Sequence, residues 1–281
     1  MSTRRWLVGC LFTSVLLVGL LLPTRVSAAP LPIINGADVP AGEQSWVVGI
    51  LQAAIDDDYT AQFCGGTLID PQWVLTAAHC TLNEQDQAFQ PADLHVLVGQ
   101  RMLHGADGAR LAVDKIVRHP AFDTTTYRND IALLHLATAT PTPFVILANS
   151  TINPALHQAQ QAMVAGWGVT EDGVGADVLQ RAQVPLVDTA TCRKFYAEYN
   201  ITVAENTLCA GYEQGGIDAC TGDSGGPLLV WNNQQRSWVQ IGIISWGSGC
   251  AEAGVYGVYT EVAGFSPWIV ATVGRSETVG Q

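Results

Sequence analysis

Three short segments of the sequence together carry a nucleophile, a base and a carboxylate. Ser224 lies in the run Gly-Asp-Ser-Gly-Gly-Pro at 222–227, His79 follows Thr-Ala-Ala and precedes a cysteine, and Asp130 lies in an otherwise apolar run. A serine hydroxyl is a weak nucleophile at neutral pH, so it needs an imidazole to take its proton and a carboxylate to hold that imidazole in one tautomer. We therefore predict that Ser224 attacks the substrate, that His79 acts as base and then as acid, and that Asp130 orients His79.

Each of these residues also has a structural interpretation. The sequence holds six histidines, and a histidine in a strand-rich domain is usually structural or exposed. Ser224 is alternatively a turn serine, since glycine-rich turns often contain one. Asp130 needs a partner in either case, because an unpaired carboxylate among apolar residues is costly. His79 is the natural partner of Asp130, because it follows Thr-Ala-Ala and precedes a cysteine. This sequence context favours the catalytic interpretation.

The three motifs resemble those of the secreted serine proteases of the trypsin and chymotrypsin family, and the resemblance runs from Ile33 to about Trp268. It implies hydrolysis of peptide bonds through an acyl-enzyme intermediate. It also implies that the backbone amides of Gly222 and Ser224 form an oxyanion hole, where loss of one donor costs about 100- to 1,000-fold in rate.

Two other functions are compatible with a serine in such a motif. A non-peptidase serine esterase would place a helix after its nucleophile, whereas an apolar β-rich run, Pro227–Trp231, follows Ser224 here. A catalytically silent binding protein on the same fold is the main alternative, because a fold does not guarantee an activity. Such a protein would be expected to have lost a catalytic residue or the oxyanion glycine, and all of them are present.

The resemblance further implies an activation pair between Ile33 and Asp223. In the family, a newly freed α-amino group pairs with the acid that precedes the catalytic serine, and this pairing fixes the oxyanion amides. The sequence Ile-Ile-Asn-Gly at 33–36 matches the segment that supplies the amino group. Removing either partner of such a buried pair would leave an unpaired charge, at a cost of roughly 3–5 kcal/mol.

The residues before Ile33 depart from the family's usual pattern. Activation is generally cleavage after a basic residue, but Ile33 follows Pro32, and the nearest upstream base is Arg25. Ala29-Pro30 and Leu31-Pro32 are two successive Xaa-Pro dipeptides, which a dipeptidyl peptidase could remove stepwise after signal cleavage. A proline-rich linker with no meaning for processing is the alternative.

A carboxylate six residues before the predicted nucleophile indicates the substrate preference. Asp218 matches the family position at the base of the primary specificity pocket, where a buried acid selects arginine and lysine. Gly247 and Gly257 match pocket-wall positions, and Ser245, Trp246 and Gly247 would form the extended strand that pairs with the substrate backbone. Asp218 is alternatively a surface turn acid, since Gly-Gly-Ile-Asp is also turn-like.

Cysteine usage favours an oxidising compartment. One cysteine lies in the apolar N-terminal run, and the other six allow 15 pairings, among which the sequence alone does not choose. The absence of any Cys-x-x-Cys pair argues against zinc. The resemblance implies three disulfides, each contributing on the order of 3 kcal/mol: Cys64–Cys80, Cys192–Cys209 and Cys220–Cys250.

No cofactor is expected to be required. The resemblance suggests a sodium site near Tyr256, because sodium-regulated relatives carry an aromatic residue at that position. The family's calcium loop would fall near Gly99–Arg110, but Gln100 stands where an acidic ligand is expected, so we do not expect calcium dependence.

The net charge of the chain limits the kinds of partner that it is expected to bind. The formal net charge is −12, and removing residues 1–32 would make it more negative, since that segment carries three arginines and no acid. This argues against binding to nucleic acid or to an anionic membrane. It is compatible with basic substrates and with simple solubility. We expect protein or peptide substrates with Arg or Lys at the cleavage site, protein protease inhibitors as further partners, and a monomer.

The N-terminal sequence is typical of an export signal. Two arginines precede an apolar run of 17 residues, and Val-Ser-Ala at 26–28 offers a cleavage site, so residues 1–28 are predicted to be a signal peptide and 29–32 a short pro-segment. A membrane anchor is the alternative, although the run is short for one. The mature protein, 33–281, is therefore expected to be secreted and free of the membrane.

Short β-rich runs punctuated by Gly, Pro, Asn and Asp dominate the remaining sequence. We predict an all-β protein of two packed antiparallel six-stranded barrels, about 33–148 and 149–265, with the active site in the cleft between them. A short C-terminal helix is expected at about 266–273, where Pro267 would occupy the first turn.

Overall fold

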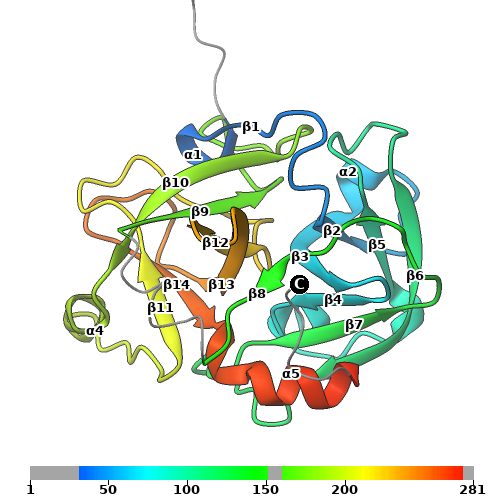
Figure 1. The fold of residues 1–281 in the computed structure, drawn as a ribbon. Helices are drawn as coiled ribbons and strands as arrows, with labels where there is room; N and C mark the ends of the chain where they lie inside the picture. Colours follow the sequence, from blue (N-terminus) through cyan, green and yellow to red (C-terminus); the bar gives the residue numbers. More distant parts are fainter. Residues whose placement is uncertain (1–31, 151–159, 275–281) are drawn as a thin grey trace, which may run out of the picture.

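The computed structural model describes residues 32–150 and 160–274 of the chain. These residues form two closed barrels of antiparallel strands, which lie side by side in Figure 1, one coloured from blue to green and the other from green to orange. The all-β fold, the two six-stranded barrels and the short C-terminal helix predicted from the sequence are confirmed. The signal peptide predicted at 1–28 lies outside the described residues.

The first barrel closes because β5 pairs with both β2 and β6. Its strand order is β2-β3-β4-β7-β6-β5, and its interior is filled by fully buried aliphatic side chains such as Leu68, Leu75 and Leu133. The strands are β2 (Val47–Gln52), β3 (Gln62–Asp70), β4 (Trp73–Thr76), β5 (Leu94–Val98), β6 (Ala109–Arg118) and β7 (Ala132–Leu136).

The second barrel closes because β9 pairs with both β10 and β12. Its interior holds a separate apolar cluster that includes Val164, Val184 and Ile241. The strands are β9 (Gln161–Gly166), β10 (Gln180–Val187), β11 (Thr207–Ala210), β12 (Pro227–Asn232), β13 (Ser237–Trp246) and β14 (Gly257–Glu261).

Two short strands from the expected first-barrel range join the second barrel instead. β1 (Ala37–Asp38) pairs with β10, and β8 (Ile146–Leu147) pairs in parallel with β13. Ile33, four residues before β1, is fully buried in the apolar cluster of the second barrel. The N-terminal segment therefore crosses to the second barrel because its isoleucine is buried there.

Helices are short in the described residues, and none of them is long and apolar enough to cross a membrane. The predicted C-terminal helix is present as α5, with a proline in its first turn, and its Ile269 packs against the first barrel's core. The α-helices are α1 (Pro32–Asn35), α2 (Asp58–Ala61), α4 (Thr189–Ala197) and α5 (Ser266–Val273), and the 3-10 helices are η1 (His79–Thr81), η2 (Pro91–Asp93) and η3 (Val262–Phe265).

Candidate active site

Strand pairing in the first barrel brings His79 and Asp130 together. β4 and β7 are antiparallel, with Thr76 opposite Ala132, so the chain just after β4 lies beside the chain just before β7. His79 Nδ1 is 2.8 Å from Asp130 Oδ2, and the His79 backbone N–H donates to Asp130 Oδ1 at 2.9 Å. A carboxylate at Nδ1 favours the tautomer with its proton there, which leaves Nε2 free to accept a proton.

The Asp130 carboxylate is fully buried, and three hydrogen bonds stabilise its charge. Besides the two donors from His79, the Ser245 hydroxyl donates to Asp130 Oδ2 at 2.5 Å. Ser245 lies near the end of β13 in the second barrel, so this bond joins the two barrels behind the histidine. The sequence predicts that Ser245 lies in the substrate-binding strand, but no local pattern indicates the contact between its side chain and Asp130.

Ser224 reaches the same pocket from the second barrel. It lies three residues before β12, and both Ser224 and His79 line a pocket of about 300 Å³. Within the described residues, no hydrogen bond joins Ser224 Oγ to His79 Nε2. Such a contact is often long in a free enzyme and shortens when substrate binds. The three predicted catalytic residues are therefore gathered at the junction of the two barrels.

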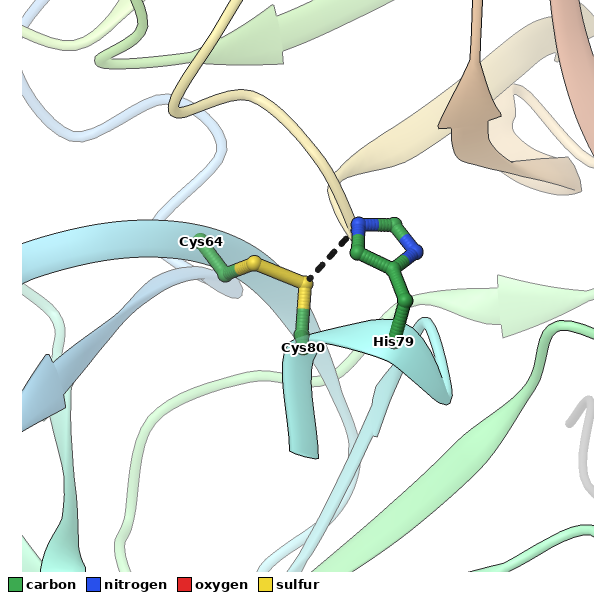
Figure 2. A group of neighbouring side chains, drawn as sticks. All are labelled: Cys64, His79 and Cys80. Atoms are coloured by element: carbon green, nitrogen blue, oxygen red, sulfur yellow. Dashed lines mark hydrogen bonds between the residues drawn. A yellow bond between two sulfur atoms is a disulfide. The ribbon is translucent and has the colours of Figure 1, made fainter. Parts of the chain in front are cut away.

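Figure 2 shows the His79 imidazole next to the Cys64–Cys80 disulfide, with Nε2 3.7 Å from Cys80 Sγ. These three side chains lie close enough to hold a metal ion in principle. Cysteine ligates metals as a thiolate, however, and both sulfurs are bonded to each other. The cluster therefore does not fit a metal centre, and its disulfide fixes the segment that carries His79.

The structure forms the three disulfides that the family resemblance implies. Cys64–Cys80 lies beside the histidine, and Cys220–Cys250 joins two segments that line the pocket shared with Ser224. Cys192–Cys209 joins α4 to β11 of the second barrel.

Glycines shape the turn that holds Ser224. Gly222 has φ of +95° and Gly225 has φ of +81°, a region that residues with a Cβ adopt at a cost. A Cβ on Gly225 would also meet Thr76 Oγ1 and the Gly65 carbonyl oxygen. The amides of Gly222 and Ser224, the predicted oxyanion donors, have no protein acceptor within the described part of the chain. They are free to donate to a substrate oxygen.

Asp223 is fully buried, next to the predicted nucleophile. Its two carboxylate oxygens accept from the amides of Gly168 at 2.8 Å and Cys220 at 2.9 Å, and burial raises the pKa of this carboxyl to about 7. Ile33 is also fully buried, but its nitrogen is in the peptide bond with Pro32 and carries no charge. The structure thus buries both residues of the predicted activation pair without pairing them.

Asp218 lines the pocket next to Ser224. It is 5% exposed, it accepts from the amides of Ala219 at 2.9 Å and Ala251 at 3.2 Å, and burial raises its pKa to about 6. A buried carboxylate with only two neutral donors is poorly compensated, so a cationic ligand would stabilise its charged form. The interpretation of Asp218 as a surface turn acid does not agree with this burial.

The remaining predicted specificity residues line the same pocket, namely Ser245, Trp246, Gly247 and Gly257. A Cβ on Gly257 would approach the Tyr259 hydroxyl to 2.9 Å, so packing against the Tyr259 side chain disfavours a larger residue at this position. The Tyr259 hydroxyl is itself buried and has no hydrogen-bond partner among the described residues. This polar atom was not anticipated from the sequence.

The candidate calcium loop is closed by a side-chain amide. Gln100 is 5% exposed, and its Nε2 donates to the carbonyl oxygens of Met102 at 2.7 Å, Leu103 at 3.2 Å and Gly105 at 3.1 Å. These carbonyls are the neutral ligands that a calcium ion would need. The loop does not fit calcium, because an N–H donor already occupies its acceptors. The sodium site near Tyr256 stays a prediction.

Comparisons with known proteins agree with this geometry. The family model described as trypsin matches residues 33–269. Trypsin eta of Drosophila erecta is 37% identical over 249 residues, which cover 86% of this chain and 90% of that protein. Bovine coagulation factor XII is 41% identical over 74% of this chain, and the match spans 35% of that longer protein. Human mannan-binding lectin serine protease 1 is 30% identical over 92% of this chain, and the match spans 39% of that protein. The chain therefore belongs to the trypsin family and is a serine endopeptidase.

Proposed function

We propose that the protein is a secreted endopeptidase that cleaves after arginine or lysine. The observation that carries this proposal is the buried carboxylate of Asp218, which lines one pocket together with Ser224 and the Asp130-bound His79. A guanidinium or ammonium group is the natural counter-ion for such a carboxylate, and an apolar side chain would leave it desolvated and unpaired.

The geometry supports a two-step mechanism. Ser224 Oγ attacks the substrate carbonyl carbon while His79 Nε2 takes its proton, and the negative oxygen accepts from the amides of Gly222 and Ser224. His79 then protonates the leaving amine, which leaves an acyl group on Ser224. In the second step His79 deprotonates a water molecule, whose oxygen attacks the acyl carbon. The ester bond to Ser224 Oγ then breaks, His79 returns the proton to that oxygen, and the acid is released. Asp130 stays ionised throughout and stabilises the imidazolium.

Activation is proposed to require release of the Ile33 amino group. Asp223 is buried with two neutral donors, so an ammonium beside it would stabilise its charge and lower its raised pKa. Because Pro32 precedes Ile33, we expect removal of the dipeptides Ala29-Pro30 and Leu31-Pro32. N-terminal sequencing of the native mature protein is expected to begin at Ile33; any other first residue would contradict this route.

Secretion and the remaining partners are proposals of the same kind. Three disulfides are typical of proteins from oxidising compartments, which supports export. We expect protein inhibitors that present an arginine or lysine to the Asp218 pocket to block the enzyme, and we expect the enzyme to act as a monomer.

The proposed specificity is tested with matched chromogenic peptides that differ only in ending with Arg or Phe. Protein beginning at Ile33 is expected to hydrolyse the Arg peptide with a kcat/KM at least about 1,000-fold higher, because phenylalanine would leave Asp218 unpaired. Preference for Phe would keep the protease and overturn the role of Asp218. No hydrolysis of either peptide would favour the silent binding protein or a different mature N-terminus.

A further inference from the structure

The side chain of Gln62 joins the first barrel to the turn that holds Ser224. Gln62 is the first residue of β3, and its Nε2 donates to the Gly222 carbonyl oxygen at 2.8 Å and to the Cys64 carbonyl oxygen at 3.1 Å. The side chain is partly buried. In the described part of the chain, the bond from Gln62 is the one hydrogen bond that the Gly222 backbone makes.

The position of this bond matters because Gly222 is conformationally free. Glycine rotates about its two backbone bonds more readily than any other residue. The peptide group before Gly222 is held by the Val169 amide, which donates to the Thr221 carbonyl oxygen at 2.7 Å. The peptide group after it is held by Gln62 and by the Asp223 amide, which donates to the Cys220 carbonyl oxygen at 3.0 Å. Gln62 thus fixes one side of the glycine.

We propose that Gln62 is a positioning residue for the oxyanion hole. By holding the peptide group that follows Gly222, it fixes the backbone between the Gly222 and Ser224 amides, and with it their relative orientation. Hydrogen bonds from these amides strengthen as the substrate oxygen becomes negative, so their misalignment weakens the transition state more than the bound substrate. The inference rests on the proposed function, because it concerns the same attack by Ser224.

The test is the substitution Gln62→Met, which keeps the length of the side chain and removes the donor. On an Arg peptide amide, kcat is expected to fall roughly tenfold or more, with KM within about twofold of the wild-type value. A peptidyl arginine aldehyde forms a hemiacetal oxyanion on Ser224, so its Ki is expected to rise by the same factor. Benzamidine fills only the Asp218 pocket, and its Ki is expected to stay unchanged.

A matched control and a second variant keep the test decisive. Gln72→Met removes an equivalent bond, in which Gln72 Nε2 donates to the Leu136 carbonyl oxygen at 3.0 Å away from the pocket, and it is expected to leave all four constants unchanged. If Gln62→Met does not fold, Gln62→Glu replaces it, because an ionised carboxylate of the same shape cannot donate at about pH 8. It is expected to show the same selective loss.

The outcomes separate this inference from the proposed function. A wild-type enzyme that does not cleave the Arg peptide would overturn the proposed function itself. Active wild type with unchanged kinetics in the Gln62 variant would overturn the positioning role alone. Parallel weakening of the aldehyde and of benzamidine would show a general structural effect and would also overturn it.

Discussion

Replacing Ser224 by alanine is expected to lower kcat/KM on an Arg peptide amide by about 10⁶-fold, since the attacking oxygen is removed while the rest of the pocket remains. The His79–Asp130 bond does not involve Ser224, so the histidine should keep its position. Benzamidine should therefore bind Ser224→Ala with the wild-type Ki. Steady-state hydrolysis and inhibitor binding, measured on protein that begins at Ile33, test both parts.

The matched control is Ser266→Ala, which changes the same residue type at the start of α5, outside the pocket. Its kcat/KM is expected to equal that of the wild type. If Ser224→Ala retained more than about one thousandth of the wild-type rate, another group would be the nucleophile, because loss of the attacking atom should leave only the contribution of the oxyanion amides.

Replacing Asp218 by asparagine is expected to lower kcat/KM for the Arg peptide by roughly 10⁴-fold and to change the value for the Phe peptide much less. The substitution removes the counter-charge of a buried guanidinium and leaves the shape of the pocket nearly unchanged. Asp56→Asn is the matched control, because Asp56 is exposed and does not line the pocket. Persistence of the Arg preference in Asp218→Asn would contradict the proposed specificity.

The same carboxylate predicts a pH dependence. Burial raises the pKa of Asp218 to about 6, so in the free enzyme the group is charged above that pH and neutral below it. The Arg-to-Phe ratio of kcat/KM is therefore expected to fall as the pH drops through about 6 and to be restored as it rises. The ratio is the useful quantity, because any effect of pH on the catalytic step that is common to both substrates cancels in it.

The sequence motifs predicted which residues meet, and strand pairing explains why they do. His79 and Asp130 follow and precede strands that pair in the same sheet, while Ser224 precedes the first half of the β12–β13 hairpin. Each has a recognisable local context in the sequence. Motifs of this kind are readable because the turn, the reactive atom and the oxyanion amides lie within a few consecutive residues.

Two contacts at the site were not predictable in this way. The Ser245–Asp130 and Gln62–Gly222 bonds join residues 115 and 160 positions apart, and each depends on how one barrel docks on the other. The residue type alone does not indicate a hydrogen-bond partner in the other barrel, because serine and glutamine are also common on protein surfaces. The loop closed by Gln100 is a different case. The sequence shows that an acidic ligand is missing there, but it does not show that three hydrogen bonds from the Gln100 amide take the place of a calcium ion.

The most direct test of the account is an active-site titration with 4-nitrophenyl 4-guanidinobenzoate, an ester whose guanidinium would pair with Asp218 while its acyl group is transferred to Ser224. Protein beginning at Ile33 is expected to release a rapid burst of about one nitrophenol per chain, followed by slow turnover, because the acyl-enzyme accumulates. Ser224→Ala should give no burst. Absence of a burst from the wild type, or an equal burst from Ser224→Ala, would contradict an acyl-enzyme formed on Ser224 beside Asp218.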